Sequence, residues 1–256
     1  MLSHKIVQRF FGLLPILLAA FVFAGGIIDD TSAYMPKSDS KGPIHTLVCG
    51  GNLRVHLDGK AKQDKSYKKL HKNVIISEKN GVLMLRGMRN KNHHADVIIA
   101  ANSLPHLEEI RVLNACGLEA NHVKLAKLRL LSRTKADIKL YGEFGAYAID
   151  QAGSNNLEML WVDADEIDVT MHGGTMQLAG IGSHARVRVS GDSKLHLRHL
   201  RMDDLWLVAA GNAFVDLYSA GHLSSFIRGN AKVVAHKRPE MLSDISKDSA
   251  ILVFEP

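Results

Sequence analysis

Short segments in which apolar and polar residues alternate recur along this chain, and they constrain its fold more than any other feature. Residues 53–57 (LRVHL), 185–189 (ARVRV) and 213–217 (AFVDL) each place their apolar side chains on one side of a strand. Gly, Asn, Asp and Ser bound these segments, and helical periodicity is hard to find between them. The pattern predicts an all-β protein.

From residue 128 onward the segments form a recurring unit of an apolar strand, a short turn, a second alternating strand and a glycine. The unit can be followed through residues 128–142, 159–173, 176–191, 205–221 and 225–236. Its matching apolar residues lie 18 to 31 positions apart, at Ile138, Val169, Val187, Val215 and Val233. One unit of this size cannot bury its own apolar side, so the units are expected to stack into a parallel β-helix, which is a solenoid.

An antiparallel β-sandwich is the alternative fold, because turn signals roughly every 8–12 residues fit that architecture as well. The recurrence of one kind of unit favours the solenoid. Few turns have the chemistry of a two-residue hairpin, and Asn80-Gly81 is the good example. In the solenoid we expect positive φ angles at the coil corners, at Gly142, Gly173, Gly191 and Gly221.

The N-terminus has the parts of an export signal. Lys5 and Arg9 precede the apolar run 10–28, which acidic residues follow. We assign residues 1–33 to a secretory signal peptide, cleaved after Ala24 or Ala33. A retained inner-membrane anchor through residues 10–28 is the alternative, because the run is nearly long enough to span a bilayer. Either assignment places the protein outside the cytoplasm, in the periplasm or at the outer membrane and cell surface.

The remaining boundaries follow from composition. Residues 34–43 are polar, contain two prolines and are expected to form a linker. The β-helix domain spans residues 44–236. Residues 237–256 are expected to cap the open end of the solenoid, with a helical turn over 239–248 and a final strand over 250–254.

Two segments also resemble a known family. Residues 44–60 (IHTLVCGGNLRVHLDGK) and 73–87 (NVIISEKNGVLMLRG) look like the start of the bacterial head GIN domain family, described as autotransporter adhesin heads. Residues 182–191 and 211–221 resemble its coil repeats. The resemblance covers about residues 44–236. It implies an exported, right-handed β-helix with no established enzymatic activity and no catalytic residues to carry over.

The chain carries a formal net charge of +6, which predicts an acidic or anionic partner. An acidic polysaccharide, a membrane surface or an envelope protein fits this charge. The densest basic stretch is 60–72, and we read it as a solvated loop. The candidate binding residues are Arg186, Arg188, Lys194, Arg198, Arg201 and Tyr218. Nucleic acid is not expected, because an exported chain without interleaved aromatic residues lacks the usual features of such binding.

No metal site, cofactor or catalytic residue is predicted. His93-His94 and the pair His196 and His199 have spacings that place their side chains on opposite sides of a strand. Trp206, Phe214 and Tyr218 would stack on sugars if they shared a face, although core packing is the favoured role. The first alternative function is a polysaccharide lyase or glycoside hydrolase that uses carboxylates on neighbouring coils, namely Asp163, Asp165, Asp203 and Asp204.

The second alternative is a purely structural envelope protein that self-associates through its ends. The oligomeric state stays open. Cys49 and Cys116 lie 67 residues apart. An oxidising compartment would allow a disulfide between them, but two buried thiols acting as small apolar residues are the favoured interpretation.

Overall fold

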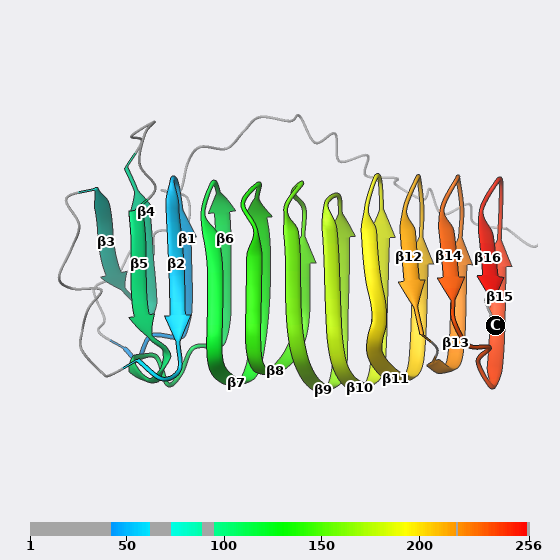
Figure 1. Ribbon diagram of the computed structural model, residues 1–256, viewed down its shortest axis with the longest axis horizontal. Coiled ribbons are helices and arrows are strands. Elements are labelled where there is room, and N and C mark those ends of the chain that lie inside the picture. Colours follow the sequence, from blue (N-terminus) through cyan, green and yellow to red (C-terminus); the bar gives the residue numbers. More distant parts are fainter. Residues whose placement is uncertain (1–41, 62–72, 89–94, 219, 255–256) are drawn as a thin grey trace, which may run out of the picture. The chain divides into compact units, whose positions relative to one another are not determined.

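The computed structural model describes residues 42–61, 73–88, 95–218 and 220–254. Their strands pair mainly in parallel and wind into the coils of a right-handed β-helix, as Figure 1 shows. The predicted solenoid is therefore confirmed, and the antiparallel sandwich is wrong. The signal or anchor segment 1–33, most of the linker 34–43, the basic residues 62–72 and His93-His94 lie outside the described residues. No helix in the described part of the chain is long and apolar enough to cross a membrane.

Each coil consists of two strand segments joined by a bend, so the solenoid has two layers. Five long strands contain both segments and the bend between them: β7 (Gly117–Thr134), β8 (Ile138–Gln151), β9 (Asn156–His172), β10 (Thr175–Ser190) and β11 (Lys194–Ala209). We call the segments before the bend the first layer and the segments after it the second layer.

Shorter strands continue both layers at the two ends of the stack. The first layer also contains β2 (Leu53–Asp58), β5 (Ala95–Ala100), β12 (Phe214–Leu217), β14 (Lys232–Ala235) and β16 (Ile251–Phe254). The second layer also contains β1 (Thr46–Gly50), β3 (Val74–Lys79), β4 (Val82–Gly87), β6 (Glu109–Asn114), β13 (Ala220–Ile227) and β15 (Met241–Ser246). A 3₁₀ turn, Ala101–Ser103, follows β5.

The core lies between the layers, where apolar side chains of successive coils stack in columns. One first-layer column runs through register partners that are at most 2% exposed: Leu118, Ile138, Leu157, Met176, Leu195, Val215 and Val233. These partners lie 18 to 20 residues apart. The repeat is thus more regular than the sequence indicated, because Val169 and Val187 belong to the second layer and do not match Ile138. Fully burying one such side chain contributes about 1.5–3 kcal/mol.

Glycines at the corners serve two different purposes. Gly173 and Gly191 have φ angles of 106° and 71°, as expected for turns. Gly142 and Gly221 do not have positive φ angles, so the expectation is wrong at these two positions. A Cβ atom at Gly142 would lie 2.0 Å from the carbonyl oxygen of Val123, so its role is to let the backbones of adjacent coils approach closely.

At the front of the stack, β3 and β4 form an antiparallel hairpin around Asn80 and Gly81, whose φ angles are 50° and 73°. The hairpin turn predicted there is confirmed. Two successive positive φ angles are those of a type I′ turn, which matches the twist of the strands on either side.

Cys49 and Cys116 form a disulfide, with their Cα atoms 6.0 Å apart. The interpretation as two separate thiols is therefore wrong. Cys49 lies in β1, and Cys116 immediately precedes β7. The winding of the first coils brings these distant positions together, which their separation in sequence does not reveal.

The helical turn expected over 239–248 is also wrong, because Met241–Ser246 is strand β15. It pairs in parallel with β13, and β16 pairs in parallel with β14. This segment therefore adds one more coil to the stack, and all six residues of β15 are exposed.

Candidate functional site

Outward-pointing side chains of the second layer form straight rows along the stack. One row, which we call the Trp206 row, consists of register partners on five successive coils: Asp168, Arg186, Trp206, Ser224 and Ser243. Successive members are separated by about 4.8 Å, the spacing of paired strands. The row therefore presents a carboxylate, a guanidinium, an indole and two hydroxyls in a line.

Arg188 holds the indole of Trp206 in place. Its guanidinium carbon lies 5.4 Å from the centre of the Trp206 ring, while Nη1 donates to Oδ1 of Asp168 at 2.9 Å. A guanidinium over an indole face is a favourable cation–π contact. Trp206 is still 43% exposed. The result is an aromatic surface that is fixed in orientation and open to solvent.

Arg186 is the exposed cation next to this indole. Its guanidinium makes no hydrogen bond or ion pair with any residue that the structure describes. It borders a shallow hollow of about 320 Å³, together with Tyr147, Glu166, Asp168 and His184. Such a guanidinium can donate two parallel hydrogen bonds to a carboxylate.

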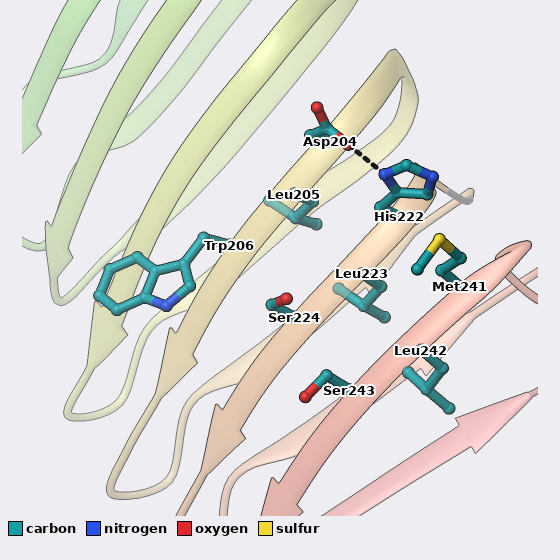
Figure 2. A pocket seen from close by; sticks show the side chains of 9 residues that line it. All are labelled: Asp204, Leu205, Trp206, His222, Leu223, Ser224, Met241, Leu242 and Ser243. Atoms are coloured by element: carbon teal, nitrogen blue, oxygen red, sulfur yellow. Dashed lines mark ion pairs between the residues drawn. The ribbon is translucent and has the colours of Figure 1, made fainter.

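A second shallow hollow, of about 370 Å³, lies on the other side of Trp206 (Figure 2). Ser224 and Ser243 continue the row there, and His222 and Met241 lie along one side. Leu205 and Leu223 are 2% and 1% exposed, so they belong to the core beneath. The small serines leave space beside the indole and offer hydroxyl groups to a ligand.

The neighbouring row is stabilised by histidine–aspartate contacts between coils. Asp204 lies between two imidazoles, with Oδ2 at 2.8 Å from Nδ1 of His184 and Oδ1 at 2.7 Å from Nδ1 of His222. In the first layer, Asp216 has the same arrangement with His196 at 3.6 Å and His236 at 2.6 Å. These contacts join residues about 20 positions apart. In the described residues no cluster of three or more His, Cys, Asp or Glu side chains has the arrangement of a metal site.

The four carboxylates considered for glycan cleavage do not meet as expected. Asp163 and Asp165 lie on β9 and Asp203 and Asp204 lie on β11, with β10 between these strands. Ile181 of β10 lies between the two coils. It is the register partner of Asp163 on β9 and of Arg201 on β11. The prediction that these carboxylates occupy neighbouring coils is therefore wrong.

The structure divides the six candidate binding residues among different surfaces. Arg186 and Arg188 lie on the second layer beside Trp206. Lys194 lies on the first layer, as the register partner of Phe214. Arg198 and Arg201 lie in the middle of β11, and Tyr218 directly follows β12.

Core packing, the role that the sequence favoured for Trp206, is wrong, because its side chain is exposed. Trp206 does not share a face with Phe214, because β11 reaches the second layer at Trp206 while β12 lies in the first. Arg186 and Ser224 lie beside Trp206 on the two adjacent coils. Their proximity to Trp206 can be inferred only when the register of the coils is known.

A family model described as "Putative auto-transporter adhesin, head GIN domain" matches residues 44–239 of this chain. The chain belongs to the head GIN domain family. The resemblance noted in the sequence is thus confirmed, and it extends over the whole of residues 44–236. No curated protein matches the chain.

Two solved structures resemble this head GIN domain. One, from Parabacteroides distasonis, is described as a "Putative lipid binding protein"; its TM-score is 0.66 at 13% identity, covering 86% of this chain and 94% of that one. The other, from Bacteroides fragilis, is described as a "putative adhesin"; its TM-score is 0.53 at 12% identity, covering 84% of this chain and 92% of that one. At these identities the likeness establishes the fold alone.

Proposed function

We propose that this head GIN domain is a non-enzymatic, adhesin-like binding module of the bacterial cell envelope, and that its Trp206 row binds an acidic glycan. The observation that carries the proposal is the exposed indole of Trp206, which Arg188 orients. Beside it lies the guanidinium of Arg186, which has no hydrogen-bond or ion-pair partner among the described residues. Both arginines lie on β10, the coil adjacent to the β11 coil that carries Trp206.

The chemistry of an acidic sugar fits these groups. The C–H face of a pyranose ring stacks on an indole, as apolar surfaces do on aromatic rings. A uronate carboxylate then accepts hydrogen bonds from Arg186. Ring hydroxyls exchange hydrogen bonds with Ser224 and Ser243 on the following coils.

The repeating coils suit a linear polymer. Five register partners form one straight row, and the parallel sheet keeps them about 4.8 Å apart. A polymer that lies along the stack therefore meets a new side chain at every coil. The two hollows on either side of the Arg186–Trp206 pair give it room to lie against the layer.

Lys194, Arg198, Arg201 and Tyr218 lie outside this row. In this proposal the three cations attract an acidic polymer through the general field of the domain, and Tyr218 makes no contact with it. The contact energy comes from Arg186 and Trp206.

Two features support export. The charge and apolar pattern of residues 1–33 is typical of a secretory signal peptide. The disulfide between Cys49 and Cys116 is of a kind that persists in oxidising compartments. The periplasm and the cell surface are both consistent with these features, and a surface position fits an adhesin-like role.

Binding without cleavage is favoured by the arrangement of the acids. Glycoside hydrolysis needs two carboxylates at a fixed separation across the scissile bond. Here Asp163 and Asp204 lie on coils that are not adjacent, and both oxygens of Asp204 contact imidazoles.

The test compares binding to immobilised polygalacturonate with binding to a neutral glucan. The parent protein should bind the uronate polymer and not the glucan. Replacing Arg186 and Arg188 by serine should weaken binding about tenfold or more, equivalent to losing ~1.4 kcal/mol. The matched control replaces two exposed first-layer lysines, Lys139 and Lys232, by serine.

The control removes the same charge and should leave binding within about twofold of the parent. Equal losses in both double variants would contradict the proposal. A second result would also contradict the proposal. In it, the protein binds anionic lipid vesicles through Arg186 and Arg188 and does not bind the uronate polymer.

A further inference from the structure

The last coil of the stack has an exposed edge. Strands β15 and β16 each pair on one side, with β13 and β14, and no other described strand pairs with them. The side chains of Met241, Ile245 and Ile251 are 62%, 55% and 48% exposed. Unpaired backbone groups and apolar side chains make such an edge a template for another β-strand.

One core column that reaches this edge changes from apolar to polar side chains over the last two coils. In the second layer its register partners run from Val169 through Val187 and Leu207 to Ser225 and Asp244. The first three side chains are at most 1% exposed and apolar. The column therefore ends in a hydroxyl and then in a carboxylate, at the register position that core side chains occupy in the earlier coils.

Asp244 is held in that inward position by two hydroxyls. The buried Ser225 donates a hydrogen bond to Oδ1, and Ser246 donates one to Oδ2 at 2.8 Å. The carboxylate is exposed, because no further coil of the described residues covers it. A strand added to β15 would cover the carboxylate, and burying a charge without a cation to pair with it is strongly unfavourable.

We propose that Asp244 is a charge stop, which prevents the edge of the last coil from pairing with the edge strand of a second copy of this chain. The apolar side chains Leu242 and Ile245 favour such pairing, and the inward carboxylate opposes it. Inward-pointing charges on edge strands are a general protection against edge-to-edge association. This inference is independent of the glycan site.

The test measures the oligomeric state of the purified full chain by sedimentation velocity over a range of protein concentrations. Asp244→Val restores an apolar residue to the end of the column and should raise the association constant about tenfold or more over the parent. Glu240→Val removes the same charge just before β15, at a position outside the column, and should behave as the parent does.

A second variant identifies the surface that associates. Leu242 occupies another inward position of β15, as the register partner of the buried Leu223. Adding Leu242→Lys to Asp244→Val returns a charge to the edge and should restore the parent state. Association that persists in this double variant, or Asp244→Val protein that sediments as the parent does, overturns the proposal. Circular dichroism confirms folding, and Asp244→Asn replaces Asp244→Val if the latter does not fold.

Discussion

The guanidinium of Arg188 contacts both the indole of Trp206, at 5.4 Å from the ring centre, and the carboxylate of Asp168, at 2.9 Å. One side chain thus connects residues of three successive coils, because Asp168 lies on β9, Arg188 on β10 and Trp206 on β11. Each contact limits the rotamers of the others. The indole is therefore oriented before any ligand arrives, which lowers the entropic cost of binding.

Replacing Trp206 by alanine should weaken binding to a uronate polymer about tenfold, because the stacking surface is lost and Arg188 is no longer oriented. Biolayer interferometry on immobilised polygalacturonate measures the change. Trp161→Ala is the matched control, since Trp161 is 71% exposed but lies outside the Trp206 row. An equal loss in both variants would show that the indole of Trp206 has no special role.

Reducing the disulfide should destabilise the first coils. A bridge that closes a 67-residue separation is expected to contribute about 4 kcal/mol through the entropy of the unfolded chain. Urea unfolding with and without reductant should therefore show a lower midpoint in reductant. The double variant Cys49→Ser, Cys116→Ser should match the reduced parent and no longer respond to reductant. An unchanged midpoint in the parent would contradict the prediction.

The core columns should be sensitive to lost volume. Leu207 is 0% exposed and lies between Val187 and Ser225 in its column. Leu207→Ala should lower the free energy of unfolding by about 2–5 kcal/mol, because it leaves a cavity between coils. Val208→Ala, at the next and outward-facing position, should cost less than about 1 kcal/mol. Comparable costs would mean that the layer assignment of β11 is wrong.

The hydroxyl of Tyr141 should lose its proton at an unusually high pH. Its hydroxyl donates a hydrogen bond to Oε2 of Glu158 at 2.8 Å, and this bond, with smaller contributions from burial and from the charge of Glu158, raises the pKa of Tyr141 to about 12. Subtracting the ultraviolet titration curve of Tyr141→Phe from that of the parent should isolate this tyrosine. A midpoint near the ordinary value of 10.0 would contradict the prediction.

The same shift predicts how stability depends on pH. The folded protein keeps the Tyr141 proton more tightly than the unfolded chain does. The stabilising contribution is thus complete below pH 10 and is lost as the pH rises toward 12. Over this interval the free energy of unfolding should fall more steeply in the parent than in Tyr141→Phe. Parallel slopes would exclude a role for the hydrogen bond to Glu158.

The sequence predicted most of the fold because alternation along one strand is a local property. In residues 185–189, for example, the pattern ARVRV places Val187 in the core and Arg186 and Arg188 outside, as the structure confirms. The hairpin at Asn80-Gly81 was predictable for the same reason, since its turn chemistry is contained in two residues.

Contacts between coils were not predictable, because they depend on the register of residues about 20 positions apart. The disulfide of Cys49, the contacts of Asp204 with two histidines and the arginine beside Trp206 all belong to this class. The prediction of a helical turn in place of strand β15 was wrong for another reason. Met241, Leu242 and Ile245 have the spacing of a helical face, and only pairing with β13 makes the segment a strand.

The central claim is that two arginines of β10 and the indole of Trp206 on the adjacent coil, β11, bind an acidic glycan. The most direct measurement is the affinity for a uronate polymer as a function of salt concentration, for the parent and for the Arg186→Ser, Arg188→Ser variant. The account predicts that salt weakens parent binding strongly and that the variant shows both lower affinity and a shallower dependence on salt. Binding that does not respond to salt, or equal affinities for the two proteins, would contradict it.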